Sequence, residues 1–185
     1  MSVSQEKINS IVWKACDAFR GSMDASKYKD YILSMLFMKY LSDFHRERLQ
    51  ALKEKYQGDE ERIKRSLARE KFILDETCTF EYLLQNKEAN NLGEIINKAL
   101  AKIEEDNPNK LEGIFRNVDF NDKNLLGESK ERNAVLRNFL EVYANPDLDL
   151  SPSKISGRDV IGDTYEFLIA KFASDSGKKG GEFFT

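Results

Sequence analysis

The first 107 residues of this 185-residue chain contain no proline, and this feature most constrains its fold. The three prolines stand at positions 108, 146 and 152. Proline interrupts helices because it lacks a backbone N–H and clashes with the preceding turn, so its absence leaves room for long helices. The 12 phenylalanines, 7 tyrosines and 1 tryptophan exclude a disordered chain, because disorder goes with few aromatic residues. The sequence therefore predicts a folded and largely helical protein.

Apolar residues at helical spacing predict one helix of unusual length. We expect it to begin near Asp24 or Ser26 and to run to about Tyr56, before Gly58. Its first half is apolar nearly all round, which is typical of a buried helix, and its second half is charged and amphipathic. About 30 helical residues span about 45 Å, which is longer than a small domain is wide. We expect this helix to be central and to project at one end.

The rest of the chain reads as shorter helices, with almost no strand signals. The last helix is expected over about 158–174, with one apolar stripe formed by Ile161, Tyr165, Leu168, Ile169 and Phe172. The predicted fold class is all-α, an irregular helical bundle with one long central helix. Residues 1–144 are predicted to form the helical amino-terminal domain. Residues 145–157 carry two prolines and are either a linker or an ordered crossing loop, and residues 158–176 hold the last helix of the domain.

Composition excludes several classes of protein. No segment approaches the roughly 20 apolar residues of a membrane helix, and the amino terminus lacks the basic start and apolar run of a signal peptide. Cys16 and Cys78 together with the single histidine, His45, cannot complete a closed zinc site. We therefore predict no metal site, no membrane partner and a reduced, cytoplasmic location.

Charge is unevenly distributed, although 29 basic and 32 acidic residues give a net charge of only −3. Residues 46–71 hold nine Lys/Arg and six Asp/Glu, a net charge of +3, whereas residues 75–122 have a net charge of −6. The basic segment is either a face for nucleic-acid phosphates or a solvated helix surface with i,i+4 ion pairs. If the segment is such a face, Arg62, Lys64 and Arg65 are the residues that would contact DNA phosphates.

No self-contained catalytic constellation is present, so we predict no catalytic residue in this chain. The sequence has no Gly-x-Ser-x-Gly turn and no P-loop. Residues 177–185 nevertheless combine glycines, two lysines and two phenylalanines. This stretch is either a flexible tail or the rim of a pocket for a flat ring, and Lys178 and Lys179 could meet phosphate.

Two stretches of the chain resemble the modification (M) subunit of type I restriction-modification systems, an adenine-specific DNA methyltransferase. Residues 13–43, with Arg-Gly-Ser-Met-Asp at positions 20–24, resemble the amino-terminal signature of that family. Residues 162–185 resemble the start of its methyltransferase domain. The resemblance implies that residues 177–185 begin an α/β methyltransferase domain that is missing from this chain.

The final residues resemble the first methyltransferase motif of the family, Gly-x-Phe-Phe/Tyr-Thr-Pro, which helps to hold S-adenosyl-L-methionine. The matching residues are Glu182, Phe183, Phe184 and Thr185, and the expected proline would be residue 186. The Asn-Pro-Pro-Phe/Tyr motif that receives adenine is absent, because both Asn-Pro pairs continue differently. We therefore expect this chain alone neither to methylate DNA nor to bind the cofactor.

The resemblance also implies partners and a role. The full protein would transfer a methyl group to adenine N6 in DNA, while a separate specificity (S) subunit reads the sequence. A second M subunit and a restriction (R) subunit would complete the complex, and the helical domain would help to enclose DNA. The alternative is a free-standing helical protein-interaction module without a catalytic role. The downstream coding sequence distinguishes the two, since only the first requires Asn-Pro-Pro-aromatic beyond residue 185.

Overall fold

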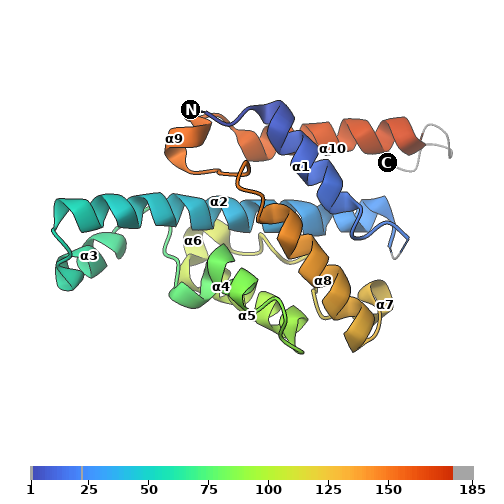
Figure 1. The fold of residues 1–185 in the computed structure, drawn as a ribbon, viewed down its shortest axis with the longest axis horizontal. Coiled ribbons are helices and arrows are strands. Elements are labelled where there is room, and N and C mark those ends of the chain that lie inside the picture. The colour runs from blue at the N-terminus through green and yellow to red at the C-terminus, as the bar shows by residue number, and fades with distance from the viewer. Residues whose placement is uncertain (1, 22, 177–185) are drawn as a thin grey trace.

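Helix α2 (Ala25–Lys55) runs along the whole length of the molecule and organises the fold (Figure 1). The computed structural model describes residues 2–21 and 23–176. No strand occurs among these residues, and the predicted all-α class is confirmed. The other helices are α1 (Gln5–Cys16), α3 (Glu60–Leu67), the 3-10 helix η1 (Glu76–Cys78), α4 (Phe80–Gln85), α5 (Leu92–Asp106), α6 (Pro108–Leu111), α7 (Lys123–Leu126), α8 (Ser129–Tyr143), α9 (Pro152–Ile155) and α10 (Val160–Ser176).

The ends of α2 follow from local backbone chemistry. Asp24 precedes the helix in an extended conformation, as predicted for its N-cap. At the other end, Gln57 and Gly58 both take positive φ angles, 52° and 81°, which stops the helix after Tyr56. The predicted boundaries of this long helix are therefore confirmed.

Helices cover the first half of α2 on two sides. Figure 1 shows α9 and α10 on one side of α2 and α4, α5 and α7 on the other, with α1 packed against both α10 and α8. Among the helices that the structure describes, α3 packs against the last turns of α2, and these two helices extend beyond the rest of the described molecule (Figure 1). The predicted projection of the long helix is confirmed.

Aromatic side chains fill the centre where α1, α2 and α8 meet. The ring of Phe19 lies 4.7 Å from that of Phe139 and 5.7 Å from that of Tyr31, between ring centroids. The fully buried Tyr143 donates its hydroxyl hydrogen to the carbonyl of Ile32 at 2.7 Å. Such pairs add directional contacts to the burial of apolar area, and they fix α8 across α2.

Residues 145–157 form an ordered loop that crosses the molecule and packs against the core. Leu148 and Leu150 are buried, and Pro152 begins the short helix α9, because proline suits the first position of a helix. The backbone N–H of Val3 donates to the carbonyl of Lys154 at 3.0 Å, so this segment also holds the amino terminus. The division of the chain into 1–144, 145–157, 158–176 and 177–185 stays a prediction.

Helix α10 shows one difference from the expected apolar stripe. Its buried side chains are Val160, Thr164, Leu168 and Phe172. Tyr165, expected in the stripe, is 45% exposed, and the prediction was wrong for this residue. The buried face is rotated because α10 meets α1 and α2 through the 160–164–168–172 row. Among the described residues, no helix combines the length and apolar character that crossing a bilayer requires.

Candidate nucleic-acid interface

The predicted DNA-binding residues Arg62, Lys64 and Arg65 all lie on the short helix α3. Ile63, 7% exposed, anchors this helix beside Leu52 of α2, which is 3% exposed. All three cationic side chains are exposed on the faces left open by that anchor. The structure therefore brings them together at the projecting tip of the molecule (Figure 1). We call these three residues the α3 basic face.

Most of the charge on the α3 basic face stays available to solvent. Arg62, with 64% of its side chain exposed, has its Nε atom 3.6 Å from the carboxylate of Asp59. Arg65 donates a hydrogen bond to the backbone carbonyl of Glu61 at 3.4 Å, and it forms no ion pair within the described part of the chain. Lys64 forms no ion pair with any residue that the structure describes. Exposed cations of this kind are suited to phosphate contacts.

Two other cations of the 46–71 segment are engaged in ion pairs. Arg46 lies 2.7 Å from Asp43 and 3.0 Å from Asp149, and Arg48 lies 2.6 Å from Glu70. These pairs hold α2 to neighbouring chain. Arg46 and Arg48 are therefore less available to a ligand than the sequence suggests, whereas the lysines and arginines of α3 and four further cations of the segment, Lys53, Lys55, Arg69 and Lys71, are exposed.

A groove of about 740 Å³ lies beside the α3 basic face, between α2, α3 and residues 72–76. Its apolar lining includes Leu49, Ile63 and Phe72, and its rim carries four acidic side chains besides its cations. Burial in this region lowers the pKa of His45, although Glu81 and Glu70 oppose the shift, so His45 is neutral near pH 7. The groove is not a basic channel, and phosphates would instead meet the outer surface of α3.

The remaining predicted site residues are not among those the structure describes. These are the predicted DNA-binding Lys178 and Lys179 and the predicted cofactor-binding Glu182, Phe183, Phe184 and Thr185. Helix α10, which precedes them, ends at Ser176, at the end of the molecule opposite α3 (Figure 1).

A buried charged network is a feature that sequence reasoning missed. Asp43, fully buried, accepts hydrogen bonds from Lys39 at 2.6 Å, from Arg46 at 2.7 Å and from the backbone N–H of Leu150 at 2.9 Å. Three carboxylates, those of Asp43, Asp149 and Glu81, therefore meet at the guanidinium of Arg46. The i,i+4 spacing of Lys39 and Asp43 within an apolar helix is the sequence signal that could have predicted this network.

Cys16 and Trp13 of α1 contribute to packing rather than to a chemical site. Burial raises the pKa of the Cys16 thiol to about 12, so it is neither a nucleophile nor a thiolate ligand near pH 7. The ring of Trp13 packs against Phe172 at 5.8 Å, with the Arg20 guanidinium 4.3 Å from its centroid. Trp13 is partly buried and thus holds α1 against α10. No cluster of three possible metal ligands occurs among the described residues.

Comparison with known families identifies the helical bundle. The family model described as HsdM N-terminal domain matches residues 8–142, and the N-6 DNA Methylase model matches residues 156–185. Since the first match covers most of the chain, this chain belongs to the HsdM N-terminal domain family.

Individual relatives agree with this assignment. The chain is 26% identical over 189 residues to the type I restriction enzyme MjaIX methylase subunit of Methanocaldococcus jannaschii, covering 94% of this chain and 32% of the relative. It is 25% identical over 201 residues to the type I restriction enzyme MpnII methylase subunit of Mycoplasma pneumoniae, covering 94% and 36%. The chain thus spans about a third of the length of these curated relatives.

A solved structure shares the fold. The type I restriction-modification system methyltransferase subunit from Streptococcus thermophilus superimposes with a TM-score of 0.69 at 26% sequence identity. The similarity covers 98% of this chain and 41% of that structure. The resemblance to modification subunits inferred from residues 13–43 and 162–185 is therefore confirmed.

Proposed function

We propose that this chain is the DNA-enclosing helical part of a type I modification subunit, and that the whole subunit methylates adenine N6 in DNA. The observation that carries the proposal is the order of the two family matches. The HsdM N-terminal domain match over 8–142 is followed, after residues 143–155, by the N-6 DNA Methylase match over 156–185. A chain in that order places the helical bundle immediately before a catalytic domain.

The chemistry belongs to the whole subunit. An enzyme that modifies a base first extrudes it from the duplex, so adenine would leave the helix before its N6 atom receives the methyl group. S-adenosyl-L-methionine would supply that methyl group. Glu182, Phe183, Phe184 and Thr185 are the proposed residues of this chain that help to hold it, a role that rests on their motif.

The α3 basic face is the proposed contact of this chain with DNA. Exposed lysine and arginine side chains contribute affinity without sequence preference, because they neutralise backbone phosphates. That property suits a subunit whose sequence readout comes from a separate S subunit. The proposed assembly also contains a second M subunit and the R subunit, acts in the cytoplasm, and includes Lys178 and Lys179 as further phosphate contacts.

A methyl-transfer assay tests the proposal. The polypeptide that carries this chain together with its methylase domain is combined with the S subunit, labelled S-adenosyl-L-methionine and DNA. We expect label in N6-methyladenine only when both subunits are present. Calorimetry of the 185-residue chain with the cofactor is expected to give no measurable heat. Absence of methyl transfer in the complete mixture would refute the proposed activity.

A further inference from the structure

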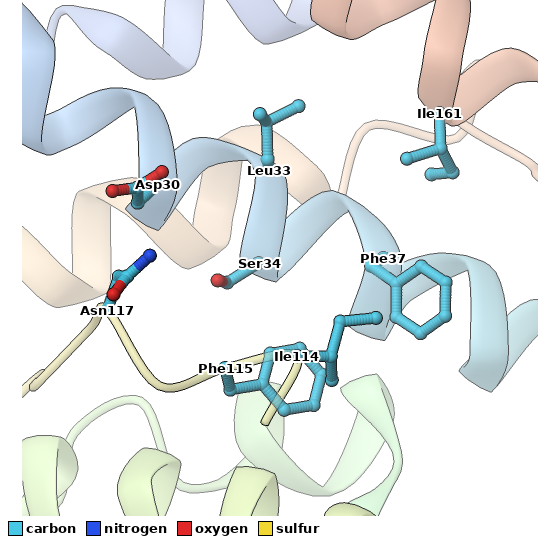
Figure 2. A pocket seen from close by; sticks show the side chains of 8 residues that line it. All are labelled: Asp30, Leu33, Ser34, Phe37, Ile114, Phe115, Asn117 and Ile161. Carbon is cyan, nitrogen blue, oxygen red and sulfur yellow. The ribbon is translucent and has the colours of Figure 1, made fainter. Parts of the chain in front are cut away.

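An apolar hollow opens on the molecule between α2, α10 and the turn that follows α6. Figure 2 shows Leu33 and Phe37 of α2, Ile161 of α10, and Ile114 and Phe115 of the turn arranged around one open space. Its volume is about 210 Å³. An apolar cavity of about 150 Å³ accommodates benzene, so the hollow has room for one large apolar side chain.

Exposed apolar side chains lie at the hollow and one helical turn from it. Ile114 is 42% exposed and Tyr165 is 45% exposed, although both are large and apolar. Tyr165 follows Ile161 by four residues, so the two side chains lie on one face of α10. Ile161 packs partly against the core of the bundle, whereas Tyr165 on the same face is largely open to solvent. Apolar residues gathered around a hollow mark a binding surface, whereas scattered ones do not.

Helix α10 has a second apolar face, and that face is already occupied. Val160, Leu168 and Phe172 are at most 1% exposed, where α10 packs on α1 and α2. A helix that is apolar on two faces is typical of an element enclosed between two bodies. The helical bundle supplies one of these bodies.

The family matches indicate the second body. The HsdM N-terminal domain match ends at residue 142, and the N-6 DNA Methylase match begins at residue 156, just before α10. Helix α10 therefore packs against the helical bundle, although its residues fall within the match to the N-6 DNA Methylase model. The relatives are about three times as long as this chain, since it covers 32% and 36% of them.

We infer that the methylase domain of the same polypeptide docks on this surface and inserts an apolar side chain into the hollow between Leu33, Phe37, Ile114 and Ile161. Such a contact would join the helical bundle to the catalytic domain at α10. The exposed side chain of Tyr165 would lie at the edge of this interface. Asp30 and Asn117, at the polar end of the hollow, would orient the inserted segment. The inference rests on the proposed function, because it requires a methylase domain after α10.

Hydroxyl-radical footprinting tests the inference without any substitution. Modification rates of Ile114 and Tyr165 are measured by mass spectrometry in the 185-residue chain and in the polypeptide that includes the methylase domain. Ile73 is a matched control, because it is the same residue type with the same exposure as Ile114, 42%, on another part of the surface. We expect Ile114 and Tyr165 to be modified at least about threefold more slowly in the longer polypeptide, since an interface core excludes water. Ile73 should be modified at the same rate in both.

Each other outcome overturns the inference. Equal rates for Ile114 in the two polypeptides would show that the surface stays open, and equal protection of Ile73 would show that the effect is not local. Protection that increases with the concentration of the 185-residue chain would assign the surface to a second copy. Protection that requires the S subunit would assign it to that partner. Methyl-transfer activity is read separately, so an active enzyme with an open surface would refute the docking and leave the proposed function standing.

Discussion

The Nζ atom of Lys39 lies 2.6 Å from the Oδ2 atom of Asp43, one helical turn along α2, and both side chains are buried. The same ammonium group donates to the carbonyl of Leu148 at 2.7 Å, and the same carboxylate accepts from the N–H of Leu150 at 2.9 Å. One ion pair within a helix therefore also holds the crossing loop to α2, more than 100 residues later in the chain.

Substitution Asp43→Asn should destabilise the protein strongly. It leaves the ammonium group of Lys39 buried without its counter-ion, and loss of one partner of a buried ion pair costs about 3–5 kcal/mol. Urea unfolding followed by circular dichroism measures the change. The control is Glu94→Gln, which breaks the exposed Glu94–Lys98 pair and should leave the urea midpoint unchanged. Equal midpoints for the two variants would show that the buried pair does not stabilise the fold.

Cys16 should make the protein less stable in alkali. Burial raises the pKa of its thiol from 9.0 to about 12, so above pH 9 the unfolded chain releases a proton that the folded chain retains. The contribution of the Cys16 thiol to the free energy of unfolding is therefore fully present below pH 9, and it is lost as the pH rises toward 12. Between about pH 8.5 and 10.5 the contribution of Cys16 to the fall is about 2 kcal/mol. Urea unfolding at both pH values should show a smaller decrease for Cys16→Ala, and an identical decrease would contradict the assignment.

Gly93→Ala should lower stability, against the usual preference of helices for alanine. Alanine in place of glycine inside a helix normally stabilises by about 1 kcal/mol. A Cβ atom at Gly93, however, would lie 2.3 Å from the carbonyl oxygen of Phe120, and the backbone would have to move. We expect a net loss of about 1–3 kcal/mol in thermal or urea unfolding. Ala101→Gly, at an exposed position of the same helix, serves as the control for ordinary propensity and should cost about 1 kcal/mol. A stabilised Gly93→Ala variant would rule out the close contact.

Local signals in the sequence predicted the architecture better than they predicted its tertiary contacts. Asp24 before a run of apolar residues was enough to place the start of α2, because capping and periodicity are local properties. The meeting of Lys39 with Leu148 depends on how the loop crosses α2, and no local pattern encodes that crossing. Tyr165 shows a third case, since its apolar character was recognised but its buried face was not. The spacing of apolar residues along a helix does not tell which neighbouring element covers each face.

The candidate DNA-binding site was also predicted only in part from the sequence. Charge counting over 46–71 identified the basic segment. The fold then separated the exposed cations of α3 from Arg46 and Arg48, which pair with Asp149 and Glu70 of other parts of the chain. Whether a cation is free depends on partners that fold next to it, so the sequence overestimates the size of such a face.

DNA binding by the assembled enzyme tests the central claim most directly. The measurement is the affinity of the M–S complex for DNA at several salt concentrations, with and without the substitutions Arg62→Glu, Lys64→Glu and Arg65→Glu. The matched control reverses three exposed lysines elsewhere, Lys98→Glu, Lys123→Glu and Lys130→Glu. If the α3 basic face contacts phosphates, the slope of log affinity against log salt becomes shallower by about two to three, and affinity at low salt falls by about tenfold or more. Unchanged affinity and slope, or losses equal to those of the control, would contradict the DNA-enclosing role of this domain.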